Sequence, residues 1–272
     1  MSQNQKIVLL TGASGGLGTA IARHLSQNHY KVYGTGRNQL SSPHYTWVEM
    51  DLSDEKSIDK AVNFVLAKEQ KIDILINNAG IGATGSIEET DINDIKKIFE
   101  VNLFGMIALT QKVLPVMRRQ RSGIIINISS IAGYTGLPFR GIYSATKSAV
   151  MRVSEALSSE VNQFNIKVID IAPGDFKTNI AAGRLYTPVN ENSPYYADYK
   201  RVLKMIDDEV NKGLKPDVLG KKINRILRKK HPKLRYNIGI FLQRMTPYLI
   251  CVLPGRFFEK LINKHYGMKH QS

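Results

Sequence analysis

A glycine-rich turn near the amino terminus places the strongest constraint on how this chain can fold. The apolar run Lys6 to Leu10 leads into the turn Thr11-Gly12-Ala13-Ser14-Gly15-Gly16-Leu17-Gly18, and a helical stretch, Thr19 to Gln27, follows. This order lets the backbone approach a pyrophosphate closely, with the helix N-terminus facing the anion. The spacing Gly-x-x-x-Gly-x-Gly is a variant of the dinucleotide fingerprint, and no Gly-Lys-[Ser/Thr] follows, which disfavours a P-loop. The turn therefore predicts a dinucleotide site; the alternative is an ordinary tight turn.

Apolar strands alternate with helical segments along the chain, which predicts an α/β fold. Further strands are expected at Lys31 to Thr35, Tyr45 to Glu49, Ile72 to Ile76, Ile124 to Ile128 and Ile166 to Ala172. Helical segments are expected at Asp54 to Lys71, Asp91 to Gln120, Ala197 to Lys212 and Val218 to Lys230, the last capped by Asp217 after Pro216. With 272 residues, 43% of them hydrophobic, the chain is long enough for one large domain with an appendage.

The end of the second expected strand indicates which dinucleotide is preferred. In dinucleotide folds an acidic residue here binds the ribose diol of NAD, whereas an arginine suits the 2′-phosphate of NADP. This chain has Gly36 in the acidic position and Arg37 next to it. The sequence therefore favours NADP(H); the alternative is a solvated arginine in a turn.

A candidate catalytic group lies between Asn127 and Lys147. Ser130 follows an apolar strand, and Tyr143 and Lys147 lie four residues apart on an expected helix, so they share one helical face. A nearby ammonium favours the ionised form of a phenol and lowers its pKa from about 10, which makes the tyrosine a usable proton donor and acceptor. Ser130 offers a hydroxyl to a carbonyl oxygen on which charge develops. By itself Tyr-x-x-x-Lys is a weak motif, because most such pairs are ordinary amphipathic neighbours.

Three further polar positions interrupt apolar segments. Asp51 follows the third strand and could meet an adenine, and Asn77-Asn78-Ala79-Gly80 would let the chain pass beside a flat ring. Asn102 lies inside an otherwise apolar stretch, where a buried amide needs hydrogen-bond partners. The alternative for Asn102 is a structural amide bonded to backbone.

Taken together, these motifs resemble the short-chain dehydrogenase/reductase family over roughly residues 5 to 180. The resemblance is specific because six motifs occur in order at the family's spacing. They are Thr11-Gly12-x-x-x-Gly16-x-Gly18, Asp51-Leu52, Asn77-Asn78-Ala79-Gly80, Asn102, Ser130 with Tyr143 and Lys147, and Pro173-Gly174 with Thr178. Phe176 departs from the family, which usually has an aliphatic residue there, and this puts the local packing in doubt.

The resemblance implies a Rossmann-type doubly wound parallel sheet and an oxidoreductase that exchanges hydride between NADP(H) and a carbonyl or secondary alcohol. It makes Tyr143 the general acid/base, Lys147 the residue that holds the nicotinamide ribose, Ser130 the residue that orients the substrate oxygen, and Asn102 the anchor of a relay water. It places the cofactor against Gly12, Ser14, Gly16, Leu17, Gly18, Arg37, Asp51, Leu52, Asn78, Ala79, Gly80, Tyr143, Lys147, Pro173, Gly174, Phe176 and Thr178. No metal is expected.

We expect a catalytic domain, residues 1–233, and a C-terminal helical extension, residues 234–272. A variable substrate lid is expected at residues 179–215, where its first part is rich in proline and tyrosine. Leu137-Pro138-Phe139 resembles the same stretch in steroid- and retinol-active members, which favours a lipophilic substrate.

The net charge of +15 is concentrated in the last quarter of the chain. Residues 200–272 contain 18 Lys+Arg and 5 Asp+Glu, whereas residues 1–199 contain 20 and 18. Basic residues beside apolar segments broken by Pro247 and Pro254 are typical of a peripheral membrane contact through residues 235–272. The alternative is that these apolar faces cover the substrate cleft or a dimer interface. Nucleic acid is disfavoured because no binding motif accompanies the charge.

Other features of the sequence indicate the cellular compartment and the oligomeric state. The single cysteine, Cys251, the lack of an apolar signal segment and the lack of an apolar run of about 18 residues favour a cytoplasmic protein, with membrane contact at most peripheral. Homo-oligomers are common in the family, so a dimer or tetramer is expected. The rival hypothesis is a catalytically silent NADP-binding regulatory protein docked on a membrane.

Overall fold

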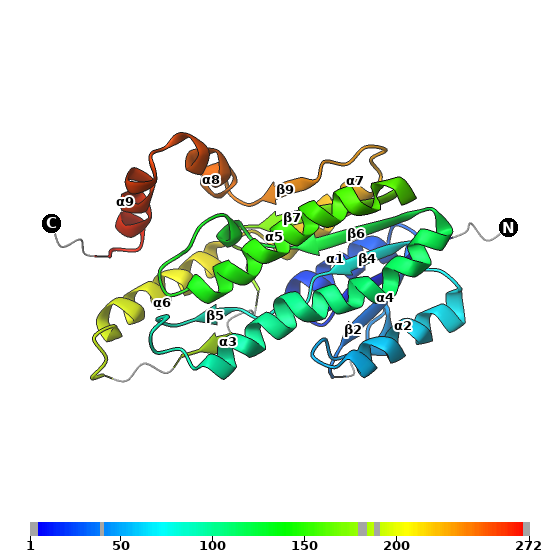
Figure 1. Ribbon diagram of the computed structural model, residues 1–272, viewed down its shortest axis with the longest axis horizontal. Helices are drawn as coiled ribbons and strands as arrows, with labels where there is room; N and C mark the ends of the chain where they lie inside the picture. Colours follow the sequence, from blue (N-terminus) through cyan, green and yellow to red (C-terminus); the bar gives the residue numbers. More distant parts are fainter. Residues whose placement is uncertain (1–4, 39–40, 179–183, 188–190, 269–272) are drawn as a thin grey trace.

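The central feature of the computed structural model is a parallel sheet of seven strands (Figure 1). The structure describes residues 5–38, 41–178, 184–187 and 191–268. The strands are β1 (Ile7–Thr11), β2 (Lys31–Gly36), β3 (Thr46–Glu49), β4 (Ile74–Asn77), β6 (Gly123–Ile128), β7 (Ile166–Pro173) and β9 (Arg235–Ile238). Their order, β3-β2-β1-β4-β6-β7-β9, reverses direction at β1 and β4, as in a doubly wound fold. This confirms the predicted fold class.

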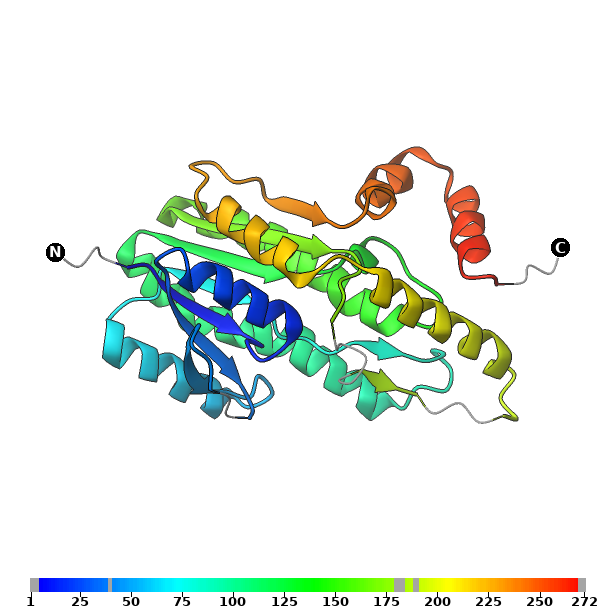
Figure 2. The ribbon, with the colours of Figure 1, turned by 180° about the vertical axis from the view of Figure 1, so that it is seen from behind.

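Helices cover both faces of the sheet because successive strand side chains point to opposite sides. Leu9 packs with α2 (Glu55–Glu69) and α4 (Gly105–Gln120), whereas Val8 and Leu10 pack with α1 (Gly16–Ser26) and α7 (Pro216–Leu227). Figure 1 shows α2, α4 and α5 (Gly141–Val161) on the near face, and Figure 2 shows α1, α7 and α6 (Tyr196–Lys212) on the other. Strands buried on both faces explain the continuous apolar runs in the sequence.

The start of α7 differs from the prediction. Lys215 is the N-cap residue and Pro216 the first helical residue, so Asp217 already lies in the first turn and does not cap the helix. Its carboxylate instead accepts hydrogen bonds from Arg23 and His24 of α1. The acidic side chain therefore ties two neighbouring helices together, and α7 ends at Leu227 rather than at Lys230.

The long helical region predicted for Asp91 to Gln120 is interrupted. α3 (Ile92–Phe99) passes into a π-helical turn, η1 (Glu100–Phe104), before α4 begins. Asn102 lies in this turn, and π-helical turns inside helices are frequent at functional sites. The hydrophobic period continues through the interruption, so the sequence pattern gave no sign of it.

The C-terminal part of the chain is joined to the main body. β9 pairs with β7, so the segment predicted as an extension from residue 234 begins with an edge strand of the central sheet. It continues as α8 (Phe241–Val252) and α9 (Gly255–His265), and Tyr266 packs against α6. A small second sheet joins β5 (Ala83–Thr84) to β8 (Leu185–Tyr186). Within the described residues, no helix has the length and apolar character needed to cross a membrane.

Candidate active site

The glycine turn forms a cradle at the carboxyl end of β1. Gly12 has a φ of 64°, and a Cβ atom there would lie 2.9 Å from the Cα atom of Ala79. The side-chain hydroxyl of Thr11 accepts hydrogen bonds from the backbone N–H groups of Asn78 and Ala79, at 2.9 and 2.8 Å. The Asn78 amide donates to the carbonyl of Thr11 at 2.9 Å. The turn after β1 and the Asn-Asn-Ala-Gly segment after β4 are thereby held as one unit.

The cradle fits a dinucleotide phosphate. α1 begins at Gly16, and its N-cap residue, Gly15, makes no side-chain capping bond, so the helix N-terminus presents backbone N–H groups to a ligand. A Cβ atom on Gly16 would lie 3.1 Å from the Thr178 side chain, which places the segment after β7 opposite the turn. A Cβ atom on Gly18 would come within 2.1 Å of the Gly12 carbonyl oxygen, so a side chain there would push α1 off the turn. These residues could hold the cofactor's pyrophosphate.

The predicted adenosine end lies beside β2 and β3. A Cβ atom on Gly36 would lie 3.5 Å from the Ser14 hydroxyl oxygen, and Arg37 is exposed next to it. Asp51 accepts hydrogen bonds from the Ser53 hydroxyl and backbone N–H, which lower its pKa, and the charge of Arg37 lowers it further. Leu52 is buried against Gly105 at the start of α4. Asp51 and Arg37 thus lie near each other at this edge of the sheet.

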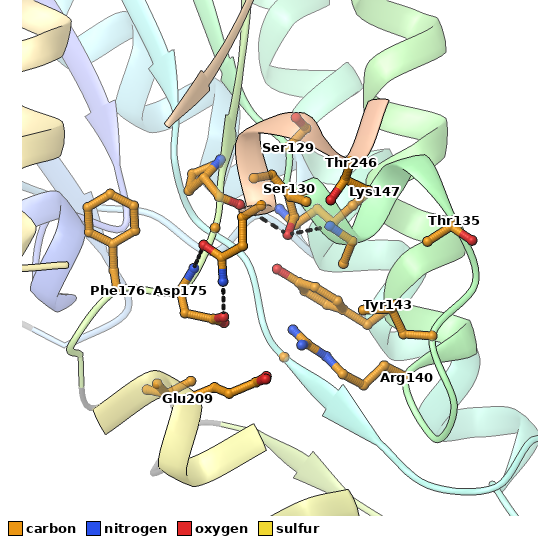
Figure 3. Close-up of a pocket in the computed structure, with 18 of the residues that line it drawn as sticks. Ser129, Ser130, Thr135, Arg140, Tyr143, Lys147, Asp175, Phe176, Glu209 and Thr246 are labelled. Atoms are coloured by element: carbon orange, nitrogen blue, oxygen red, sulfur yellow. Dashed lines mark hydrogen bonds between the residues drawn. The ribbon is translucent and has the colours of Figure 1, made fainter. Parts of the chain in front are cut away.

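Ser130, Tyr143 and Lys147 converge on one space (Figure 3). α5 begins at Gly141, so Tyr143 and Lys147 lie in its first two turns. The Lys147 ammonium is buried, donates to the Ile128 carbonyl at 2.9 Å, and lies 5.9 Å from the centroid of the Tyr143 ring. The strand end and the helix start therefore bring together three of the four residues predicted as catalytic.

Ser129 and Ser130, which are adjacent in the sequence, differ in their surroundings. The Ser129 hydroxyl donates to the Ile171 carbonyl at 3.2 Å, within the β6–β7 pair. Ser130 caps the short 3-10 helix Ile131–Tyr134, and its hydroxyl accepts from the Ala132 N–H at 3.1 Å and donates to the Pro173 carbonyl at 3.5 Å. Both hydroxyls thus contact β7, but Ser130 is 9% exposed and Ser129 only 2%, so Ser130 is the better placed of the two to meet a substrate oxygen.

A second Tyr-x-x-x-Lys motif shows what the spacing alone provides. Tyr196 and Lys200 lie on α6, where the ammonium donates to the phenol oxygen at 2.9 Å. Lys200 is exposed, in contrast to the buried Lys147. The pair lies outside the cavity described below. Burial and location, rather than the motif, distinguish Tyr143 and Lys147.

Asn102 is buried, and its amide bonds to the backbone of Ile81 and to the Thr146 hydroxyl, the latter at 3.2 Å. Its amide oxygen accepts from the Ile81 N–H at 2.8 Å and its amide nitrogen donates to the Ile81 carbonyl at 2.9 Å. A Cβ atom on Gly80 would lie 3.1 Å from the Asn102 amide oxygen and 3.3 Å from the Lys147 ammonium. These bonds are of the kind that the alternative hypothesis expects, and they hold the side chain next to Lys147, where the relay role was predicted.

A cavity of about 440 Å³ opens in front of Tyr143, within the range of small-molecule sites. Of the residues predicted for the site, those that line it are Leu17, Asn78, Gly80, Ser130, Tyr143, Lys147, Pro173, Gly174, Phe176 and Thr178. Those that lie outside its lining are Gly12, Ser14, Gly16, Gly18, Arg37, Asp51, Leu52, Ala79 and Asn102. The catalytic end of the predicted site thus borders the cavity, and most of the predicted adenosine end does not.

Phe176 lines the cavity but is itself largely buried. Its side chain packs in the core layer beside α1 and α7, and its backbone forms a bridge with Leu214. The bulky ring at this position is therefore accommodated by the core. Of the predicted lid, residues 179–183 and 188–190 lie outside the described residues.

α8 and α9 form the far wall of the cavity, which the sequence offered only as one alternative for the C-terminal segment. Gln243 of α8 donates to the Asp175 carboxylate and accepts from the Asp175 N–H at 3.3 Å, which holds α8 over the cavity (Figure 3). Burial raises the pKa of Asp175, and the charge of Arg140 opposes this. The Arg140 guanidinium lies 5.2 Å from the Tyr143 ring centroid. No local motif marks these residues, because they become neighbours only after α8 and α9 fold back.

α9 is held to α6 by an ion pair that can be tested by pH. The His265 imidazole lies 2.8 Å from Glu209, and this hydrogen bond raises the pKa of His265 above its ordinary value of 6.5. Because the pKa is raised in the folded state, the stabilisation is fully present below pH 6.5 and is lost as pH rises through the folded-state pKa. We expect Glu209→Gln to lower the His265 pKa, measured by NMR titration. An unaltered His265 titration would contradict the pairing.

Comparisons with known proteins agree with this geometry. The family model described as short chain dehydrogenase matches residues 6–187. A 3-ketodihydrosphingosine reductase of Bacteroides thetaiotaomicron is 36% identical over 266 residues, which cover 97% of this chain and 99% of that protein. The solved structure of a short-chain dehydrogenase from Streptomyces avermitilis is 31% identical, with a TM-score of 0.83 over 99% of this chain and 100% of that one. A 3-ketoacyl-(acyl-carrier-protein) reductase from Brucella melitensis, complexed with NADH, is 25% identical, with a TM-score of 0.73 over 86% and 96%.

Proposed function

This chain belongs to the short-chain dehydrogenase/reductase family, and on that basis we propose that it is an NADP(H)-dependent oxidoreductase acting on a lipophilic ketone or secondary alcohol. The observation that carries the proposal is the convergence of Ser130, Tyr143 and buried Lys147 on the cavity beside the glycine cradle. A homo-oligomer in the cytoplasm remains our prediction for the assembly and location.

In the proposed mechanism the protein positions the reactants and moves a proton. When bound, the nicotinamide supplies or accepts the hydride. In the direction of reduction, the Ser130 and Tyr143 hydroxyls donate hydrogen bonds to the substrate oxygen, and Tyr143 transfers its proton as negative charge develops there. The Lys147 ammonium favours the phenolate that remains. Asn102 supports this arrangement by holding the π-helical turn next to Lys147, and we propose that it anchors the water that returns the proton.

Arg37 is proposed to set the cofactor preference. Its guanidinium is exposed beside Gly36, which occupies the position where an acidic residue would bind a ribose diol. A hydrogen bond between charged groups contributes about 1.5–3 kcal/mol, so Arg37→Ala is expected to weaken NADPH binding by about 10- to 100-fold and to leave NADH binding nearly unchanged. Fluorescence titration measures both dissociation constants, with Arg152→Ala, an exposed arginine on α5, as the control. An equal loss for both cofactors, or no loss, would contradict the assignment.

The cavity supports a substrate with a long apolar part. Apolar side chains from four separate regions line it: Ile81, Leu137, Leu249, Phe258, Leu261 and Ile262. The similarity to a protein named as a 3-ketodihydrosphingosine reductase points in the same direction, because that substrate is a ketone on a long alkyl chain.

A series of ketones of increasing alkyl length tests this proposal directly. With NADPH in excess, each added methylene that becomes buried contributes about 0.8 kcal/mol, so kcat/KM should rise by about threefold to fourfold per methylene until the cavity is filled. Leu249→Asn should reduce this slope and leave the shortest ketones little affected. A flat series would contradict a lipophilic substrate and leave the redox chemistry itself intact.

A further inference from the structure

The two C-terminal helices expose an unusual amount of apolar surface. None of the residues of α8 and α9 is buried, and both helices lie at the outer edge of the molecule (Figures 1 and 2). Of the 14 large hydrophobic side chains exposed in the described part of the chain, seven lie between residues 240 and 261. Concentrated apolar surface outside a core marks a place where a partner binds.

α8 carries apolar side chains on two neighbouring faces. The inner face, which lines the cavity, consists of Leu242, Thr246 and Leu249. The outer face consists of Phe241, Met245, Tyr248 and Val252, which follow one helical stripe. Phe241, Tyr248 and Val252 are 75%, 62% and 79% exposed. A helix that is apolar on both faces requires two apolar neighbours, and the cavity provides only one.

α9 continues the same surface. Phe257 and Leu261 lie one turn apart and are 52% and 41% exposed, whereas Phe258 and Ile262 line the cavity. Leu261 is exposed and also lines the cavity, and the same is true of Leu242 and Ile240. The outer apolar surface is therefore continuous with the lining of the substrate cavity.

The charge around this surface indicates the kind of partner. Residues 239–268 contain four exposed basic side chains, Arg244, Arg256, Lys260 and Lys264, and a single acidic one, Glu259. Basic residues flanking an exposed apolar stripe fit the headgroups and acyl boundary of an anionic bilayer, with about 1 kcal/mol for each basic residue near the surface. A second copy of the chain would bring the same positive charge, which opposes self-association through this face. α8 has 12 residues and α9 has 11, so they would lie in the plane of the bilayer surface and not across it.

We propose that the outer faces of α8 and α9 bind the surface of an anionic phospholipid bilayer, and that the lipophilic substrate passes from the bilayer between these helices into the cavity. The passage of substrate rests on the proposed function, whereas the docking does not. The helices then supply an apolar path on which the alkyl chain never has to cross water.

The double variant Phe241→Glu/Val252→Glu tests the docking. Both residues are highly exposed, and neither lines the cavity, so fold and site should be preserved. In flotation with phosphatidylcholine–phosphatidylglycerol vesicles, the full chain should float, and the variant's affinity should fall by about tenfold or more. Ile92→Glu/Val218→Glu, which alters two exposed apolar residues on α3 and α7, should float like the unaltered chain. Absence of flotation by the unaltered chain, or equal losses in both variants, would overturn the proposal.

Rates of ketone reduction distinguish an effect on membrane docking from an effect on the catalytic step. The Phe241→Glu/Val252→Glu variant should reduce a short, water-soluble ketone as fast as the unaltered chain does. Its rate on a long-chain ketone embedded in vesicles should fall by about the same factor as its affinity for the vesicles. Equal rates on the embedded ketone would overturn the passage between the helices. No reduction of either ketone by the unaltered chain, with flotation intact, would refute the proposed function and support the docking. Light scattering in the absence of lipid tests for self-association. If the unaltered chain were a dimer and only the Phe241→Glu/Val252→Glu variant were a monomer, the surface would be assigned to self-association.

Discussion

Replacing Tyr143 by Phe is expected to lower kcat by about 10²- to 10⁴-fold, the contribution typical of a positioned general acid. The substitution removes the phenol that lies beside Ser130 and Lys147 in the cavity. The aromatic ring remains, so its packing against Arg140 and the shape of the cavity should be preserved. NADPH affinity should therefore change little, and stopped-flow turnover together with fluorescence titration measures both quantities.

The second Tyr-x-x-x-Lys motif provides a control for this experiment. Tyr196→Phe removes a phenol with a lysine partner at hydrogen-bond distance, on an exposed face of α6. It should leave kcat unchanged. If the Tyr143 and Tyr196 variants were equally active, or if Tyr143→Phe abolished cofactor binding together with turnover, the proton-transfer role would be refuted.

Replacing Arg235 by Leu is expected to have the largest effect on stability. Arg235 of β9 forms an ion pair with Asp170 of β7, whose side chain is 0% exposed. Burial raises the pKa of Asp170, and the charge of Arg235 lowers it. Removal of Arg235 leaves this buried carboxylate without its ion-pair partner, a change that costs about 3–5 kcal/mol. Urea unfolding of the unaltered and variant chains measures the loss.

The effect should depend on pH in a defined direction. Without Arg235, the pKa of Asp170 rises further in the folded state, so the variant binds a proton that the unfolded chain releases. Its stability therefore falls as pH rises from the unfolded value of about 3.8 through the raised folded value, and the difference from the unaltered chain should be smaller at acid pH than at neutral pH. Asp170→Asn/Arg235→Leu should recover part of the loss. Arg256→Leu, at an exposed pair with Glu259, should cost little. A loss independent of pH would contradict the role of the buried charge.

The local parts of the site could be predicted from the sequence. The glycine turn and the Tyr143–Lys147 pair depend on spacing within one turn or one helix, which a sequence displays directly. The choice of Ser130 over Ser129 depended on the family's spacing, and the structure adds that Ser130 is the more exposed of the two.

The parts that depend on long-range packing could not be predicted. The hydrophobic period of the segment from Asp91 to Gln120 does not reveal the π-helical turn, because Asn102 is fixed there by the distant backbone of Ile81. Asp217 has the character of a capping residue, but its partners Arg23 and His24 come from α1. The sequence of the apolar C-terminal segment was compatible with a cavity wall, a dimer interface or a membrane-binding surface. The structure places α8 and α9 at the cavity.

Transfer of deuterium from the cofactor tests the central claim most directly. NADPH deuterated at C4 of the nicotinamide would be incubated with the intact chain and a long-chain ketone, and the alcohol analysed by mass spectrometry. We expect one deuterium on the carbinol carbon, from one of the two C4-deuterated forms only, and none with Tyr143→Phe over the same time. Tight NADPH binding with no deuterated alcohol from any ketone of the series would contradict the account and favour a silent regulatory protein.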